Sequence, residues 1–157
     1  MRILGIDPGT AITGFGVIDS KSGKSDLITA GVIRTPAKQA LELRLKTLFE
    51  ELGKLLKEYQ PEQVAVEQLY FAANVTTAIS VSHARGVVLL LAAQSGLQVA
   101  DYTPLQVKQA LTGYGRADKQ QIQQMVKELL KLEHAPHPDD AADALAVAIC
   151  HAATIST

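Results

Sequence analysis

Short apolar runs separated by turns fill the first part of the chain. Three runs rich in Ile, Val, Leu and Phe cover residues 1–6, 13–19 and 27–34, and each has the length and composition of a β-strand. The segment 21–24 between the second and third runs contains Gly23, which supplies the positive φ that a tight turn needs. We therefore expect three sequential strands, with the second running antiparallel to its neighbours.

The spacing of apolar residues then changes to that of a helix. Residues 37–59 carry Leu, Phe and Tyr on one helical face and charged side chains on the other. Pro61 precedes a short apolar run at Gln63–Glu67, which predicts a fourth strand. A second helix is expected to begin after the capping residue Asn74 and to run towards Gly96, before a fifth strand at 97–102.

The last third of the chain is predicted to be helical. Thr103 followed by Pro104 is typical of a helix start, and the glycines at 113 and 115 break the chain before another amphipathic segment. A final helix is expected to begin near Asp139. This order of elements predicts one α/β domain over residues 1–157, with a mixed five-stranded sheet flanked by helices.

Composition and charge narrow the class of protein. The chain has 157 residues, is 47% hydrophobic and carries a net charge of -1, so a wholly basic surface is absent. Residues 68–131 nevertheless carry six basic against three acidic side chains, a local charge of +3 that suits phosphate. No long apolar run or signal-peptide pattern stands out, which predicts a cytoplasmic protein outside the membrane. Cys150 lies in an alanine-rich run and is expected to be a buried, unreactive thiol.

Four carboxylates are the candidate chemical groups. Asp7 ends the first predicted strand and Glu67 the fourth, so parallel pairing would place both at one edge of the sheet. Asp140 and Asp143 are three residues apart and share one face of a helix. Each acid alone has an ordinary explanation as a turn, strand-end or capping residue. Together they would repel one another unless Mg²⁺ or Mn²⁺ bound between them, and two such ions can hold a phosphodiester, so we predict a metal-dependent nuclease.

The acids occur within fragments that together resemble the RuvC family of crossover-junction endonucleases, whose fold is ribonuclease-H-like. The resemblance extends over essentially the whole chain. The matching fragments are GIDPG at 5–9, TGFG at 13–16, VEQ at 66–68, ARGV at 84–87, QVKQ at 106–109 and DAADALA at 140–146.

The resemblance implies a homodimer that binds four-way Holliday junctions and makes two symmetric nicks during DNA recombination and repair. Asp7, Glu67, Asp140 and Asp143 match the acids that hold two Mg²⁺ ions in this family, with Mn²⁺ as a substitute. By this analogy Asp7 is shared between the metals, whereas the position of Asp140 is histidine in some relatives. Branch-migration subunits of the RuvA and RuvB type are the partners implied.

Five further residues match positions that are expected to contact DNA. Lys108 and Lys119 correspond to lysines near the scissile phosphate. Arg85 is expected to contact the DNA backbone or to form a structural salt bridge. Tyr70, with Phe71 as the adjacent candidate, is expected to stack on an unpaired base, unless either ring packs in the core. Some relatives continue with a basic tail beyond the position of Thr157, so DNA binding here is expected to be sensitive to salt.

Three alternatives remain at this stage. Compact RNA-processing nucleases share an N-terminal Asp-x-Gly pattern, and so do actin-like and sugar-kinase ATPases, which need two such domains. A non-catalytic junction-binding module would carry the acids incidentally. For the dimer, the helix over 74–94 is a candidate contact or else a core helix; the face considered comprises Ala78, Val81, Arg85, Val88 and Ala92.

Overall fold

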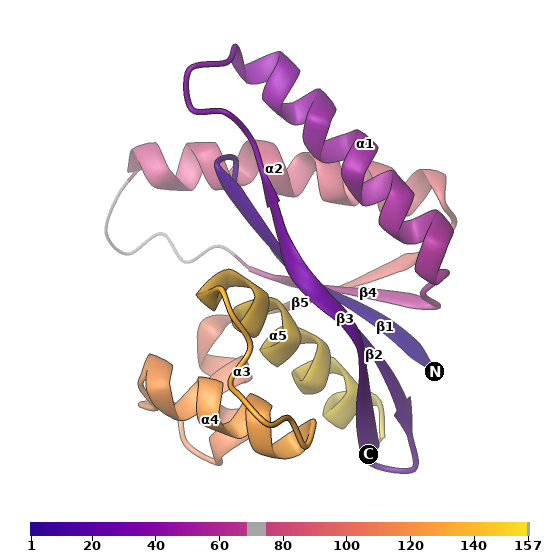
Figure 1. Cartoon of the computed structure of the whole chain (residues 1–157), viewed down its shortest axis with the longest axis vertical. Helices are drawn as coiled ribbons and strands as arrows, with labels where there is room; N and C mark the ends of the chain where they lie inside the picture. The colour runs from indigo at the N-terminus through magenta and orange to yellow at the C-terminus, as the bar shows by residue number, and fades with distance from the viewer. Residues whose placement is uncertain (69–74, 157) are drawn as a thin grey trace.

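A mixed five-stranded sheet forms the centre of the computed structural model, which describes residues 1–68 and 75–156 (Figure 1). The strand order is β3-β2-β1-β4-β5. Antiparallel pairing joins β1 to β2 and β2 to β3, and parallel pairing joins β1 to β4 and β4 to β5, which confirms the predicted sheet. The strands are β1 (Arg2–Asp7), β2 (Ile12–Lys21), β3 (Lys24–Arg34), β4 (Gln63–Glu67) and β5 (Gln98–Tyr102).

The hairpin between β2 and β3 is longer than the apolar runs alone indicate. Its ladder continues to the pair Lys21 and Lys24, with Ser22 and Gly23 between them at φ 51 and 75. Two successive positive φ values match the twist of a two-residue hairpin turn. Polar residues beyond the apolar runs are therefore part of the strands, because backbone pairing continues to the turn.

Helices cover both faces of the sheet in two layers. In Figure 1, α1 and α2 lie on one side and α3, α4 and α5 on the other. Each layer buries its own apolar core against the sheet. The helices are α1 (Leu41–Tyr59), α2 (Val75–Gln94), α3 (Pro104–Thr112), α4 (Lys119–Leu129) and α5 (Asp139–Ile155).

Alternation along β1 sends its side chains to the two cores in turn. Leu4 and Ile6 pack in the core beneath α1 and α2, whereas Ile3 packs in the core beneath α5. Gly5 is on the same face as Ile3, directly against Ala144 and Ala148 of α5. The same period of two assigns Asp7 to the α5 face of the sheet.

The predicted start of the first helix, residue 37, was too early. Helix α1 begins at Leu41, after a turn in which the Gln39 N–H donates to the Pro36 carbonyl at 3.2 Å. Apolar spacing does not reveal such a turn, because it involves backbone groups only. The predicted cap Asn74 lies outside the described residues, and the helix that follows it is confirmed from Val75.

Helix α2 carries apolar side chains on both its buried and its exposed side, and this misled the prediction of its exposed face. Ala78, Val88 and Ala92 are buried within the chain, so the face considered for a dimer contact is turned inward. The exposed apolar side instead carries Val75, Ile79, Leu89 and Leu90. By length and composition α2 could also cross a membrane, which the sequence reading did not anticipate. Its burial against α1 and the sheet is that of a core helix.

A buried polar contact fastens the second half of α5 to two strands. His151 Nδ1 lies 2.7 Å from the Tyr102 hydroxyl, and His151 Nε2 lies against the Gln63 side-chain oxygen. Because that oxygen can only accept, His151 carries its proton on Nε2 and accepts from Tyr102. The preceding residue, Cys150, is buried as predicted, and burial raises the pKa of its thiol to about 11.

Candidate active site

Two of the four predicted acids leave the sheet on the same face. Asp7 is the last residue of β1 and Glu67 the last residue of β4, and these strands pair in parallel. Ala65 packs in the α5 core, so alternation places Glu67 on the α5 face as well. Parallel pairing thus brings both carboxylates to one edge beneath α5, as the sequence predicted.

Helix α5 brings the other two acids to this edge because it lies unusually close to the sheet. A β-carbon on Gly14 of β2 would overlap the backbone carbonyl of Asp140, and one on Gly5 would overlap that of Ala144. Small residues on both surfaces permit this approach. The start of α5 therefore sits against β1 and β2, and its first turns reach Asp7.

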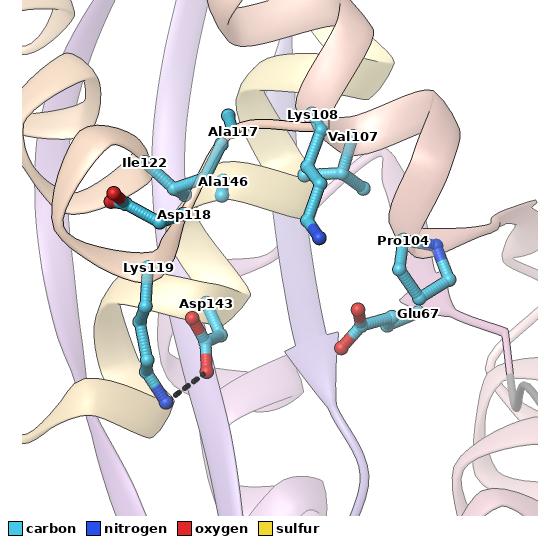
Figure 2. A pocket seen from close by; sticks show the side chains of 10 residues that line it. All are labelled: Glu67, Pro104, Val107, Lys108, Ala117, Asp118, Lys119, Ile122, Asp143 and Ala146. Atoms are coloured by element: carbon cyan, nitrogen blue, oxygen red, sulfur yellow. Dashed lines mark ion pairs between the residues drawn. The ribbon is translucent and has the colours of Figure 1, made fainter. Parts of the chain in front are cut away.

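Asp7, Asp140 and Asp143 form a compact group, which we name the carboxylate cluster. One carboxylate oxygen from each lies within 4.8 Å of the other two. Glu67 lies beside the cluster, and its carboxyl group is close enough to Asp7 to share a proton with it. Figure 2 shows Glu67 and Asp143 on opposite walls of one cleft.

The acids strongly perturb one another. Burial raises the pKa of Asp7 to about 8, and the charge of Glu67 and then that of Asp143 add to the rise. Burial also raises the pKa of Glu67, against the opposing effects of its hydrogen bond to Asp7 and of nearby lysines. For Asp143, burial raises the pKa and the charge of Lys119 opposes it. Without a counter-ion, the cluster thus disfavours full ionisation.

These properties fit a divalent cation. Hard ions such as Mg²⁺ prefer carboxylate oxygens, and several converging carboxylates with elevated pKa values supply the negative charge that such an ion neutralises. Asp7, Asp140 and Asp143 have the spacing to share one ion, and Glu67 is placed to contribute from the opposite wall. The donor set therefore supports metal binding.

Two lysines line the same cleft, whose volume is about 230 Å³. Lys108 extends from α3 towards the space between Asp143 and Glu67 (Figure 2). Lys119 Nζ lies 3.4 Å from Asp143 Oδ2 and 3.5 Å from Asp139 Oδ2. The positive charge of the Lys119 ammonium thus partly offsets the negative charge of the carboxylate cluster.

Capping boxes fix the helices that carry these lysines. The Thr103 hydroxyl accepts from the Gln106 N–H at the start of α3, and the Asp118 carboxylate accepts from the Gln121 N–H at the start of α4. In both cases the side-chain oxygen of the glutamine accepts a hydrogen bond from the backbone N–H of the capping residue. Lys119 is therefore the first residue of a well-defined helix.

The loop after Asp7 is attached to the opposite helix layer. The Thr10 hydroxyl donates to the Ser80 carbonyl of α2 at 2.6 Å, and the Thr35 hydroxyl donates to the Thr10 carbonyl at 2.5 Å. Arg44 of α1 donates to the Thr35 hydroxyl at 2.9 Å. Sequence reasoning missed this network, because isolated threonines and serines have no pattern that predicts their partners.

Arg85, another predicted DNA contact, is not one of the residues that line the cleft. Arg85 Nη2 forms an ion pair with Asp101 Oδ1 at 2.7 Å, and only 18% of the Arg85 side chain is exposed. That geometry corresponds to the structural salt bridge that was the alternative for this residue. Tyr70 and Phe71 lie outside the described residues. Asp139, in the first turn of α5, contacts Gln123 and Lys119 of α4.

Comparison with known proteins places this geometry in a family. The family model described as "Crossover junction endodeoxyribonuclease RuvC" matches residues 3–151. The chain belongs to the RuvC family. The chain has the ribonuclease-H-like fold and belongs to the class of crossover junction endodeoxyribonucleases. Both the family resemblance and the nuclease prediction are therefore confirmed.

Individual members of the RuvC family match over almost their full length. A RuvC of Desulfitobacterium hafniense is 60% identical over 156 residues, covering 99% of this chain and 94% of that relative. One of Desulforamulus reducens is 59% identical over 157 residues, covering 100% and 96%. The structure of Thermus thermophilus RuvC "in complex with Holliday junction substrate" matches with a TM-score of 0.94 and 37% identity, covering 99% and 95%.

Proposed function

We propose that this chain, as a single nuclease domain over residues 1–157, resolves four-way DNA junctions by nicking two opposed strands. The observation that carries the proposal is that Asp143, a member of the carboxylate cluster, lines the same cleft as Glu67, Lys108 and Lys119. A cleft that holds acids for metal and lysines for phosphate suits phosphodiester hydrolysis. The match to a RuvC structure bound to a Holliday junction supports the choice of substrate.

In this proposal Asp7, Glu67, Asp140 and Asp143 hold two magnesium ions, with manganese as a substitute. When bound, magnesium activates water and stabilises the additional charge on the phosphate. Asp7 is placed to be shared, since it is close to both Asp143 and Glu67. The raised pKa values of Asp7 and Glu67 mean that metal and protons compete for these oxygens.

The lysines orient the substrate rather than the metal. Lys108 points into the space between the two acidic walls, where its ammonium can donate to a phosphate oxygen. Lys119 stands at the wall formed by Asp143. Positioned donors of this kind stabilise charge that develops on the reacting phosphate.

A direct test is nicking of a synthetic four-way junction in magnesium. We expect cuts in two opposed strands and no cutting of a linear duplex of the same sequence. Asp7→Asn is expected to bind the junction and to lose cutting, because a neutral amide cannot replace the carboxylate. Cutting by Asp7→Asn at the wild-type rate would contradict the assignment.

The same assay separates the alternatives. A non-catalytic junction-binding module would bind the junction and show no magnesium-dependent nicking. An RNA-processing nuclease would cut structured RNA in preference to the DNA junction. Membership of the RuvC family favours the DNA junction over both.

Two nicks in opposed strands require two active sites, so we also propose a homodimer. The exposed apolar side of α2 is the contact surface that the structure favours, since Val75, Ile79 and Leu90 are respectively 75%, 54% and 55% exposed. Apolar side chains grouped on one helix face are typical of a protein interface. Branch-migration subunits of the RuvA and RuvB type are further partners, and the cytoplasm is the proposed location.

A further inference from the structure

Asp139 joins the start of α5 to the start of α4. Its Oδ1 accepts from the Gln123 side-chain amide at 2.9 Å, and its Oδ2 lies 3.5 Å from Lys119 Nζ. Lys119 and Gln123 are four residues apart and therefore lie on one face of α4. A single carboxylate thus orients two side chains of the neighbouring helix.

The two carboxylates around the Lys119 ammonium differ in their surroundings. Asp143 belongs to the carboxylate cluster and is 27% exposed, whereas Asp139 is outside the cluster and 56% exposed. When Asp143 gives its oxygens to a divalent cation, it is no longer a free partner for an ammonium, and the positive charge of the cation repels Lys119. Asp139 is not a metal ligand in this proposal, so its carboxylate stays available to Lys119 when the cation binds.

We propose that Asp139 is a positioning residue that holds Lys119 at the wall of the cleft while Asp143 binds metal, so that the ammonium remains directed at substrate phosphate. The inference rests on the proposed function, because it concerns how Lys119 acts in the nicking reaction. Gln123 strengthens the arrangement by fixing the other oxygen of the Asp139 carboxylate. Asp139 itself touches neither metal nor DNA in this account.

The first experiment is single-turnover nicking by Asp139→Asn at saturating junction and saturating magnesium. We expect the rate to fall about two- to fivefold, the size that a half-exposed ion pair supports. Junction affinity without magnesium, measured by fluorescence anisotropy, is expected to stay equal or to tighten, because the change removes a negative charge. Weakened metal-free binding or a lowered Tm would instead assign Asp139 a purely structural role and overturn the inference.

A matched control makes the same change of charge elsewhere. Glu128 lies on α4, where its carboxylate accepts from the Gln124 side-chain amide at 2.9 Å, so Glu128→Gln is expected to nick at the wild-type rate. A loss equal to that of Asp139→Asn would mean that net charge alone matters, which would overturn the inference. A magnesium titration adds a second check, since rescue of Asp139→Asn by higher magnesium would show that Asp139 attracts the metal instead.

A double-mutant cycle identifies the residue through which Asp139 acts. In a Lys119→Met background, where nicking is followed over hours, Asp139→Asn is expected to cause no further loss. Losses that add would overturn the inference. Failure of the wild-type protein to nick junctions would overturn the proposed function and the inference together, whereas wild-type nicking that Asp139→Asn leaves unchanged would overturn the inference alone.

Discussion

The backbone carbonyl of Asp140 lies directly over Gly14, so close that a β-carbon on this glycine would overlap it. The overlap involves backbone on the α5 side, which a side-chain rotation cannot relieve. The short distance between α5 and the sheet therefore requires glycine, which has no β-carbon, at position 14. That distance determines where Asp140 and Asp143 stand relative to Asp7.

Gly14→Ala is expected to displace the start of α5 and to weaken metal binding. Overpacking of this kind costs about 1–3 kcal/mol of stability. Calorimetric titration with Mg²⁺ or Mn²⁺ and thermal denaturation measure the two effects. The control is Gly53→Ala in α1, where a β-carbon meets only Leu91 at 4.0 Å and a helical alanine is favourable. Equal behaviour of both variants would contradict the role of the close approach.

Ionisation of Asp7 is expected to destabilise the metal-free protein in alkaline solution. The folded-state pKa of about 8 lies above the ordinary aspartate value of 3.8, so stability from this group is complete below pH 3.8 and is lost as pH rises through about 8. Magnesium is expected to reverse the loss, because it neutralises the same charge. Thermal denaturation from pH 6 to 9 with and without magnesium measures this.

The matched variant is Asp7→Asn, which removes the ionising group at similar volume. At pH 8.5 without metal it is expected to raise the Tm by roughly 3–6 °C, and magnesium is expected to stabilise it less than the wild type. A wild-type Tm that rises between pH 6 and 9 in the absence of metal, together with an Asp7→Asn Tm that does not, would contradict this sign.

Lys108 is expected to contribute to nicking through its charge. Lys108→Met keeps most of the side-chain volume and removes the ammonium, so the single-turnover rate should fall about 100-fold. Lys46→Met is the control, since Lys46 pairs with Glu50 on α1, on the opposite face of the sheet. Similar losses in both variants would show that total positive charge, and not the position of Lys108, determines the rate.

His151 is expected to limit stability in acid. Burial lowers its pKa below the ordinary histidine value of 6.5, so the stability present above pH 6.5 is lost as pH falls through the folded-state pKa. Tyr102→Phe removes the hydroxyl that donates to His151 and should cost about 1 kcal/mol at neutral pH. Urea denaturation of both proteins at pH 5 and 7.5 tests this. Because Asp7 also affects stability in this pH range, its contribution is measured as the difference between the wild type and Asp7→Asn at each pH and is subtracted. Equal corrected stability of the wild type at pH 5 and 7.5 would count against the assignment to His151.

The exposed side of α2 is expected to carry the dimer contact. Leu90→Glu should convert a dimer of twice 16.8 kDa into a monomer in multi-angle light scattering, because a buried, unpaired carboxylate is unfavourable. Leu43→Glu is the matched control: this leucine of α1 is 46% exposed and lies outside the proposed surface. Dissociation by Leu43→Glu alone would place the contact on α1.

Local patterns were sufficient to predict most of the fold. Short apolar runs identified β1 and β4, and the acid at the end of each predicted one edge of the sheet. The family resemblance then supplied the position of the last helix relative to them. Apolar spacing was less informative for α2, because its apolar side chains lie on both its buried and its exposed side and do not show which side is buried.

The contacts of the site depend on tertiary approach and were not predictable in the same way. The sequence identifies Asp139 as an acid in the first turn of a helix, which a favourable helix dipole already explains. Its contacts with Lys119 and Gln123 arise only when α4 packs beside α5. The ion pair of Arg85 with Asp101 likewise depends on how α2 crosses β5.

The candidate site is divided between parts of the fold that become ordered through different cores. Asp7 ends β1, and Thr10 fastens the loop that follows it to α2, whereas Asp140 and Asp143 are carried by α5 in the other layer. A chain in which either layer has not yet docked holds only part of the ligand set and cannot bind metal as the folded protein does. Metal binding, and nicking with it, is therefore expected only when both helix layers are packed on the sheet.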